Sequence, residues 1–412
     1  MCALLSNIGS VQMQIGKPIK NKRGKNIMAN FKAIDEFLSE YVKTGPAGCG
    51  VAVAKGGETL YENYFGYANL EEKKPITADT VYRQFSATKI IICTAAMILY
   101  ERGKFLLQDP IYEYFPEWRD TQVAVTAPDG TVTVRPVKRP IQVADCFNMC
   151  MGIGYGGTDY THKIMNQVRA NLEANDPKYT LRDDIRAMSV VPVAFDPGEH
   201  WLYGFGHELV AGMIEATSGM KVSEFLQKEI FEPLGMDHTG YRYFGNMREN
   251  MVTAYQLNPD GTRTPTVGMF DARHEPDATY EAGGAGLFSN VRDYVTFTQM
   301  LANGGKLKGE RIIGRKTIDL MRQNRLNDVQ MSEFTNSYLD GYGYGLGVRT
   351  LIDPARVSNS SVGEFGWTGA MGTYVNIDPS EQVSVVYMHN SVPNNEEYTH
   401  HRIRNMAFGA LD

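Results

Sequence analysis

Regular hydrophobic patterning begins near residue 31, where apolar residues recur with the spacing of a helix. Two strand-like runs, residues 50–55 and 59–66, then flank a Gly-Gly pair and predict a β-hairpin. The apolar run at residues 90–99 has the length of a helix and contains neither Gly nor Pro. It predicts a helix that is buried on every side.

The middle of the chain is predicted to contain two hairpins and a mostly helical region. Residues 121–137 alternate around an Asp-Gly pair and predict a hairpin, and a second Asp-Gly pair at residues 260–261 predicts another. Residues 141–245 are mostly helical by their period and by the placement of Gly and Pro.

Strand-like runs return at residues 343–348, 372–377 and 382–388, and a final helix is expected over residues 401–411. Strands at both ends with helices between them predict an α+β fold. We expect an antiparallel sheet built from both chain ends, flanked by helices, with a mostly helical insertion at about residues 104–280. A substrate site belongs in the crevice between these two parts.

The 412 residues suit one large domain or two closely joined ones, and a net charge of −6 gives no reason to expect nucleic acid or a membrane surface as partner. Residues 1–27 carry basic side chains and no acid. We interpret residues 1–27 as a basic, disordered extension and residues 28–412 as the folded domain.

The cysteine count and the start of the chain bear on its location. Five cysteines, an odd number, favour free thiols in a reducing compartment. The basic charges near the start follow the short apolar stretch rather than precede it, which is not the pattern of a signal peptide. No apolar run is long enough to span a bilayer, and we expect a cytoplasmic protein.

The first candidate for chemistry is Ser86-Ala87-Thr88-Lys89, at the start of the predicted buried helix. Lys89 lies one turn after Ser86 on the same face, where a desolvated lysine can take the proton of the serine hydroxyl. The pattern alone is weak, because Ser218 and Lys221 repeat it where Gly219 should end a helix. Ser86 could equally be only a helix N-cap.

Two further segments strengthen the interpretation. Tyr203 follows a Gly-bearing loop directly before a predicted helix, and a neighbouring ammonium would favour its phenolate. Residues 366–374 are rich in Gly and precede a strand, which we expect at a sheet edge, where backbone amides can face an oxyanion. The alternatives are a packed tyrosine, one of 23, and a simple turn.

The order of these motifs carries a resemblance. The chain runs Ser-x-x-Lys at 86–89, Tyr-Gly-Phe at 203–205, a Gly-rich stretch at 282–289 and Trp-Thr-Gly at 367–369. This series resembles the serine β-lactamase and penicillin-binding protein superfamily. It is most similar to the class C β-lactamase-like branch, and within that branch to the family VIII carboxylesterases. Lys43-Thr44-Gly45 matches the family's Lys-Thr-Gly signature and Tyr61-Glu62-Asn63 matches its Tyr-x-Asn signature. Both precede Ser86 instead of following it, so we reject them.

The resemblance implies roles for individual residues. Ser86 would be the acylated nucleophile, and Lys89 and Tyr203 would share its proton. The backbone amides of Ser86 and Ala370 would form the oxyanion hole. Contacts with a small-molecule acyl substrate would come from four further residues, namely Trp367, Gly369, Phe205 and Tyr155. The family needs no metal and no cofactor for this chemistry.

Two departures from the family pattern bear on the substrate. β-Lactamases of the family have Lys where Trp367 stands and Asn where Phe205 stands. Two groups that hold a carboxylate and an amide are thus replaced by aromatic rings. This favours neutral acyl substrates such as esters.

Several activities share the same first half-reaction. The acyl-serine would also form in an amidase or D-aminopeptidase, a weak β-lactamase or an acyltransferase. A non-catalytic ligand sensor is an alternative of another class, and the intact Ser86, Lys89 and Tyr203 argue against it because a sensor needs no base. A metallohydrolase is disfavoured because His207-Glu208 has no second histidine at the required spacing. A Gly-x-Ser-x-Gly elbow is also missing from the sequence.

Overall fold

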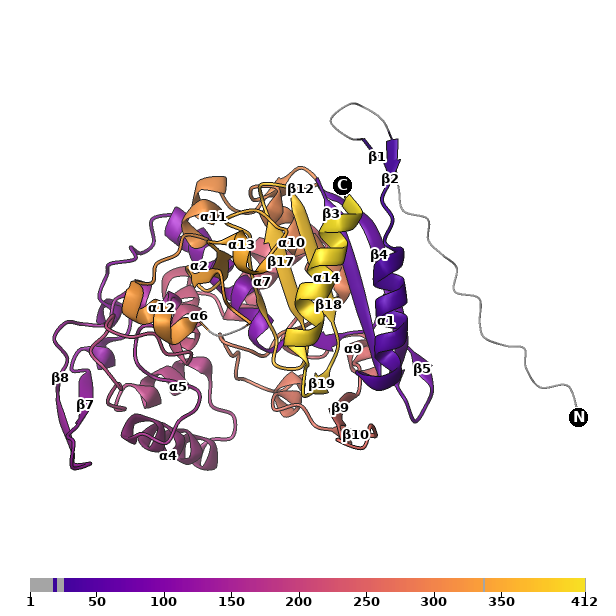
Figure 1. Ribbon diagram of the computed structural model, residues 1–412. Coiled ribbons are helices and arrows are strands. Elements are labelled where there is room, and N and C mark those ends of the chain that lie inside the picture. The colour runs from indigo at the N-terminus through magenta and orange to yellow at the C-terminus, as the bar shows by residue number, and fades with distance from the viewer. Residues whose placement is uncertain (1–17, 21–25, 336–337, 412) are drawn as a thin grey trace, which may run out of the picture.

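The computed structural model describes residues 18–20, 26–335 and 338–411 (Figure 1). Within this part of the chain, eight strands form the main antiparallel sheet, in the order β14-β15-β16-β17-β18-β3-β4-β5. Their bounds are Tyr342–Tyr344, Arg349–Leu351, Phe365–Thr368, Tyr374–Asp378, Val383–Met388, Gly48–Lys55, Glu58–Asn69 and Lys74–Pro75. The short strands β1 (Pro18–Lys20) and β2 (Asn26–Met28) pair separately, and the predicted extension over residues 1–27 lies almost wholly outside the described residues.

The two ends of the chain meet where β18 pairs with β3. Helices α1 (Lys32–Thr44) and α14 (Glu396–Leu411) lie side by side over one face of the sheet (Figure 1) and share an apolar cluster with it. Helix α10 (Val291–Ala302) packs against β3, β17 and β18 and belongs to the other, larger cluster. The predicted α+β fold, with a sheet built from both chain ends, is confirmed.

Helix α2 (Thr88–Glu101) is the centre of the larger cluster. Its residues 88–99 are all buried, as the unbroken apolar run predicts. Helix α6 (Gly206–Ser218) packs along it and ends at Gly219, which takes the left-handed conformation with φ 73°. Ser218 therefore ends a helix, as expected, while Ser86 precedes one.

The remaining helices and hairpins lie mostly between the two halves of the sheet in sequence. Both hairpins predicted for the middle of the chain are present, as β7–β8 (Gln122–Thr126, Val132–Pro136) and β9–β10 (Ala254–Leu257, Arg263–Thr266). The other helices are α3 (Val143–Phe147), α4 (Tyr160–Asn175), α5 (Leu181–Met188), α7 (Val222–Leu226), α8 (Glu232–Leu234), α9 (Met247–Asn250), α11 (Arg315–Met321), α12 (Asp328–Phe334) and α13 (Pro354–Val357). The short strand pairs are β6–β11 (Tyr82–Arg83, Phe288–Ser289) and β12–β13 (Lys306–Leu307, Glu310–Arg311), and β19 (Ser391–Val392) joins β9. No helix of the described residues combines the length and apolar character needed to cross a bilayer.

One expectation about the sheet is wrong. The strand that carries Trp367, β16, is not an edge strand, because β15 pairs with its outer side. The run predicted as one strand over residues 343–348 is a turn between β14 and β15 for most of its length. This hairpin adds two strands beyond β16.

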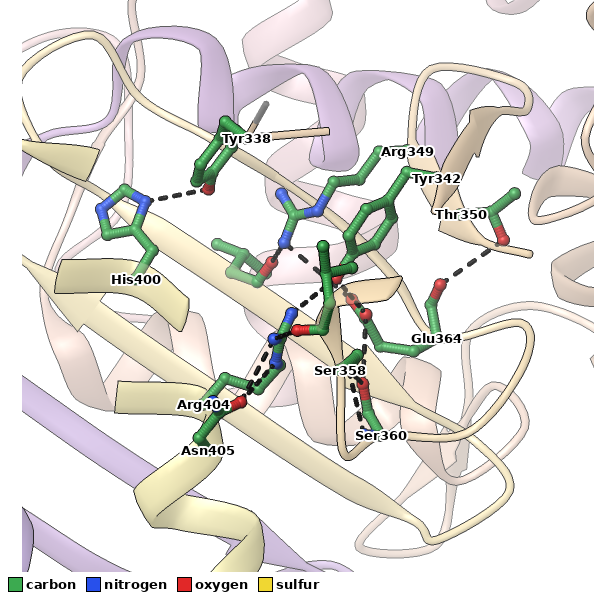
Figure 2. Close-up of polar contacts among 12 residues, drawn as sticks. Tyr338, Tyr342, Arg349, Thr350, Ser358, Ser360, Glu364, His400, Arg404 and Asn405 are labelled. Carbon is green, nitrogen blue, oxygen red and sulfur yellow. Dashed lines mark hydrogen bonds and ion pairs between the residues drawn. The ribbon is translucent and has the colours of Figure 1, made fainter. Parts of the chain in front are cut away.

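A buried polar network ties this hairpin to α14 (Figure 2). Glu364 accepts a hydrogen bond of 2.8 Å from the Tyr342 hydroxyl and lies 3.9 Å from the Arg349 guanidinium. Arg404 of α14 also donates to the Tyr342 hydroxyl, at 2.8 Å. All four side chains are buried, so each charge depends on the others. The network fixes the start of β16.

Removing the carboxylate should therefore destabilise the fold. We expect Glu364→Ala to lower the free energy of unfolding by about 3 kcal/mol, because it leaves buried guanidinium groups without their anion. Urea unfolding followed by circular dichroism measures it. Glu36→Ala, which removes an exposed ion pair with Lys32, is the control and should change stability by less than about 0.5 kcal/mol. Equal effects of the two substitutions would contradict this account.

Candidate active site

Ser86 lies in a single 3₁₀ turn, residues Phe85–Ala87, between β6 and α2. The preceding residue, Phe85, has a φ of 45°, in the left-handed region that residues other than Gly rarely adopt. Such backbone strain clusters at functional sites, because the surrounding structure must hold it in place. The turn leaves the Ser86 side chain partly exposed while its neighbours Phe85 and Ala87 are buried.

Lys89 is fully buried, and its ammonium nitrogen makes two polar contacts. The Nζ atom lies 3.1 Å from the Ser86 Oγ and 2.5 Å from the Gly284 carbonyl oxygen. It also lies 4.7 Å from the centre of the Tyr203 ring and 5.0 Å from that of Tyr155. The predicted pair of Ser86 and Lys89 is thus within hydrogen-bond distance, with the Lys89 nitrogen buried and the Ser86 side chain partly exposed.

The loop that carries Tyr203 passes close to the backbone of Ile153, and this brings the Tyr203 ring beside Lys89. A Cβ atom at Gly204 would lie 1.9 Å from the Ile153 carbonyl oxygen, so only Gly fits there. The Tyr203 hydroxyl oxygen accepts a hydrogen bond of 2.9 Å from the indole nitrogen of Trp367. Trp367 is therefore a hydrogen-bond donor to Tyr203.

Ser86, Tyr203, Trp367 and Ala370 line one cavity of about 270 Å³. The Ala370 amide donates no hydrogen bond to any of the described residues, which leaves it available to an oxyanion. The rest of the cavity is mostly polar; its further lining residues are Tyr338, Leu339, Arg349, Thr368, Asn394, Glu396 and Glu397.

The other three predicted substrate contacts lie behind this surface. Phe205 is buried with its ring centre 4.6 Å from that of Tyr155. A Cβ atom at Gly369 would lie 2.4 Å from the Gln84 carbonyl oxygen, so this Gly permits close packing beside Ser86. None of Tyr155, Phe205 and Gly369 is among the residues that line the 270 Å³ cavity.

The described residues contain no cluster of His, Cys, Asp and Glu that could hold a metal ion. His207 is buried beside α2, and its Nε2 atom lies 3.0 Å from the Phe147 carbonyl oxygen. Burial, assisted by the charge of Lys89, lowers the pKa of His207 to about 3. His207 is therefore a neutral packing residue at physiological pH.

Two groups at this site were not foreseen from the sequence. The Gly284 carbonyl accepts a hydrogen bond from Lys89, whereas the sequence indicates the Gly-rich stretch only by its place in the motif order. Glu208 accepts hydrogen bonds from the Gly283 and Gly284 amides, whereas its position after His207 suggests only an incomplete metal motif. The Gly-rich stretch was the available signal, since closely packed backbone often borders a site.

The family profile described as beta-lactamase matches residues 34–409, nearly the whole chain. The chain belongs to the beta-lactamase family. Membership confirms the predicted superfamily and indicates an enzyme of the serine hydrolase class.

Relatives within this family are distant. The chain is 27% identical to Protein Rv1367c of Mycobacterium tuberculosis, over 80% of this chain and 82% of that protein. It is 23% identical to esterase EstB of Burkholderia gladioli, over 82% and 84% of the two chains. The solved structure of EstCE1, described as a hydrolase with promiscuous acyltransferase activity, has a TM-score of 0.75 at 21% identity and covers 93% of this chain and 98% of its own.

The hydrogen bond from Trp367 to Tyr203 can be tested on its own. Trp367→Phe keeps an aromatic ring but removes the N–H donor, and we expect kcat for p-nitrophenyl butyrate to fall about tenfold with little change in KM. The control is Trp201→Phe, since the Trp201 ring stacks on Tyr203 but its indole nitrogen has no partner among the described residues. If both variants lose activity equally, ring packing rather than the hydrogen bond is responsible.

Proposed function

We propose that this enzyme hydrolyses carboxylic esters through a covalent acyl-serine intermediate. The observation that carries the proposal is that Ser86 and Tyr203 line one cavity while the buried Lys89 ammonium nitrogen lies 3.1 Å from the Ser86 Oγ, with the Trp367 indole bonded to Tyr203. It supplies a nucleophile, a buried base and a second proton carrier within a few ångströms.

The proposed reaction has two halves. Lys89, in its neutral form and aided by Tyr203, accepts the Ser86 proton as the Oγ atom attacks the ester carbonyl. The amides of Ser86 and Ala370 stabilise the resulting oxyanion. The intermediate then expels the alcohol, which takes its proton from Tyr203. In the second half, water gives a proton to the same pair and attacks the acyl carbon, and Ser86 leaves with its proton restored.

The cavity favours neutral substrates. Trp367 presents an aromatic surface where the family's lysine would hold a carboxylate, and Glu396 and Glu397 add negative charge to the same wall. Arg349 also lines the cavity, but its guanidinium faces Glu364 and donates to the Val375 carbonyl at 3.0 Å. A small, uncharged acyl group therefore meets the least electrostatic penalty here.

We also propose a cytoplasmic location and a division into an extension over residues 1–27 and one domain over residues 28–412, whose mostly helical part spans about residues 104–280. The four cysteines of the described residues, namely Cys49, Cys93, Cys146 and Cys150, are all free and buried, which supports a reducing compartment. Cys2 lies outside the described residues.

Removing the nucleophile tests the central step. We expect Ser86→Ala to reduce hydrolysis of p-nitrophenyl butyrate by roughly 1000-fold or more while leaving thermal unfolding unchanged. Ser218→Ala, in the second Ser-x-x-Lys sequence, is the control and should keep full activity. A chromogenic cephalosporin measured alongside should be cleaved slowly by the unaltered enzyme. Persistent ester turnover by Ser86→Ala would exclude this serine as the nucleophile.

Restoring the family's lysine tests the substrate proposal. We expect Trp367→Lys to raise the ratio of kcat/KM for mono-p-nitrophenyl succinate over p-nitrophenyl butyrate by about tenfold, the worth of one hydrogen bond to a charged group. Trp367→Met removes the indole without adding charge and should leave the ratio near its original value. A ratio that rises equally in both variants would mean that space, rather than charge, decides the preference.

A further inference from the structure

Glu208 is a buried carboxylate in the first turn of α6 that the proposed reaction does not use. Its two oxygens accept hydrogen bonds from consecutive backbone amides: Oε2 from Gly283, and Oε1 from Gly284 at 3.2 Å. The carboxylate therefore fixes the position of this part of the Gly-rich stretch.

The same stretch holds the candidate base. The Gly284 carbonyl oxygen lies 2.5 Å from the Lys89 ammonium nitrogen. A Cβ atom built on Gly284 would lie 2.0 Å from the Tyr155 hydroxyl oxygen and 3.2 Å from both Glu208 Oε1 and Lys89 Nζ. The carboxylate, the lysine and the tyrosine thus converge on one glycine that has no room for a side chain.

We propose that Glu208 is a positioning residue for Lys89. It sets the Gly284 carbonyl at the distance that directs the Lys89 nitrogen toward Ser86, and its negative charge balances the buried ammonium. The inference rests on the proposed function, because it assigns Glu208 to the base of that reaction. Glu208 itself touches neither the cavity nor the nucleophile in this account.

The charges around the pair support this role. Glu208 interacts electrostatically with Asp184, Arg169 and Lys89, and Asp184 is already paired with Arg169 at 3.2 Å. Burial raises the pKa of the Glu208 carboxyl, whereas Arg169, Lys89 and the Gly283 amide oppose the rise. The other titratable groups that face Glu208 or Lys89 are Tyr155, Tyr203, Tyr241, Tyr280, His207 and Cys93.

Most of those groups stay uncharged around neutral pH. Burial raises the pKa values of Tyr155, Tyr241 and Tyr280 well above the ordinary value for tyrosine. Burial likewise raises the pKa of Cys93 and keeps that of His207 low. Asp184 is paired with Arg169, whereas Glu208 forms no salt bridge with an Arg or Lys side chain of the described residues. Glu208 is thus an anion whose charge is available to Lys89.

The test compares Glu208→Gln with Glu208→Asp and the control Glu215→Gln. Glu215 lies two turns further along α6 and is half-buried, and among the described residues its carboxylate accepts no hydrogen bond from the Gly283 or Gly284 amide, both of which bind Glu208. One readout is the rate at which a fluorophosphonate labels Ser86 between pH 5 and 10, in which the Oγ atom displaces fluoride from phosphorus. The other is kcat for p-nitrophenyl butyrate over the same range, with thermal unfolding as the check on folding.

We expect Glu208→Gln to slow both reactions by about 100-fold at neutral pH, because the base is displaced from Ser86. The limb on which the rate rises with pH should move down by about one pH unit, since the ammonium form of Lys89 loses its anion. Glu208→Asp retains the charge, so its rate should rise at the same pH as in the unaltered enzyme. Its rate at neutral pH should lie between those of Glu208→Gln and the unaltered enzyme. Glu215→Gln should match the unaltered enzyme.

Three results would overturn the inference. In the first, the rate of Glu208→Gln rises with pH at the same pH as in the unaltered enzyme. In the second, Glu208→Gln and Glu208→Asp lose equal activity, in proportion to their loss of thermal stability. In the third, Glu215→Gln shifts the rise in rate by the same amount as Glu208→Gln. An unaltered enzyme that is labelled at Ser86 but inert on esters would contradict the ester substrate while leaving Glu208 testable by labelling. Labelling away from Ser86 would contradict both proposals.

Discussion

The burial of a lysine ammonium group at the start of α2 is the constraint on which the site depends. Lys89 has no exposed surface, so every polar contact that it needs must come from the protein. Ser86, the Gly284 carbonyl and two tyrosine rings supply those contacts. The turn before α2 carries Ser86, the Gly-rich stretch provides the Gly284 carbonyl, and Glu208 holds the amides of that stretch.

The second structural requirement is the placement of Trp367. Its strand, β16, lies inside the sheet, between the β14–β15 hairpin and β17. The buried network of Arg349, Glu364, Tyr342 and Arg404 secures that hairpin to the C-terminal helix. A strand held on both sides therefore presents the indole of Trp367 to Tyr203, where it donates a hydrogen bond to the hydroxyl oxygen.

Local patterns predicted much of this arrangement. The unbroken apolar run gave α2, alternation around turn residues gave the hairpins, and the helix start placed Ser86 and Lys89 one turn apart. Contacts between distant segments were beyond reach of these patterns. Lys89 and Gly284 are separated by 195 positions and Tyr203 and Trp367 by 164, and neither contact leaves a periodic signal. The interior position of β16 was missed because its neighbour β15 is only three residues long.

The most direct measurement is peptide mapping of the enzyme quenched in acid while it turns over p-nitrophenyl butyrate. Trypsin should release residues 84–89 as one peptide, which contains both Ser86 and Lys89. We expect this peptide to carry the butyryl group on Ser86, and the modification to disappear once the ester is exhausted. A butyryl group on another residue during turnover would contradict the proposed nucleophile, and an unmodified Ser86 peptide while product forms would contradict an acyl-serine that accumulates during turnover.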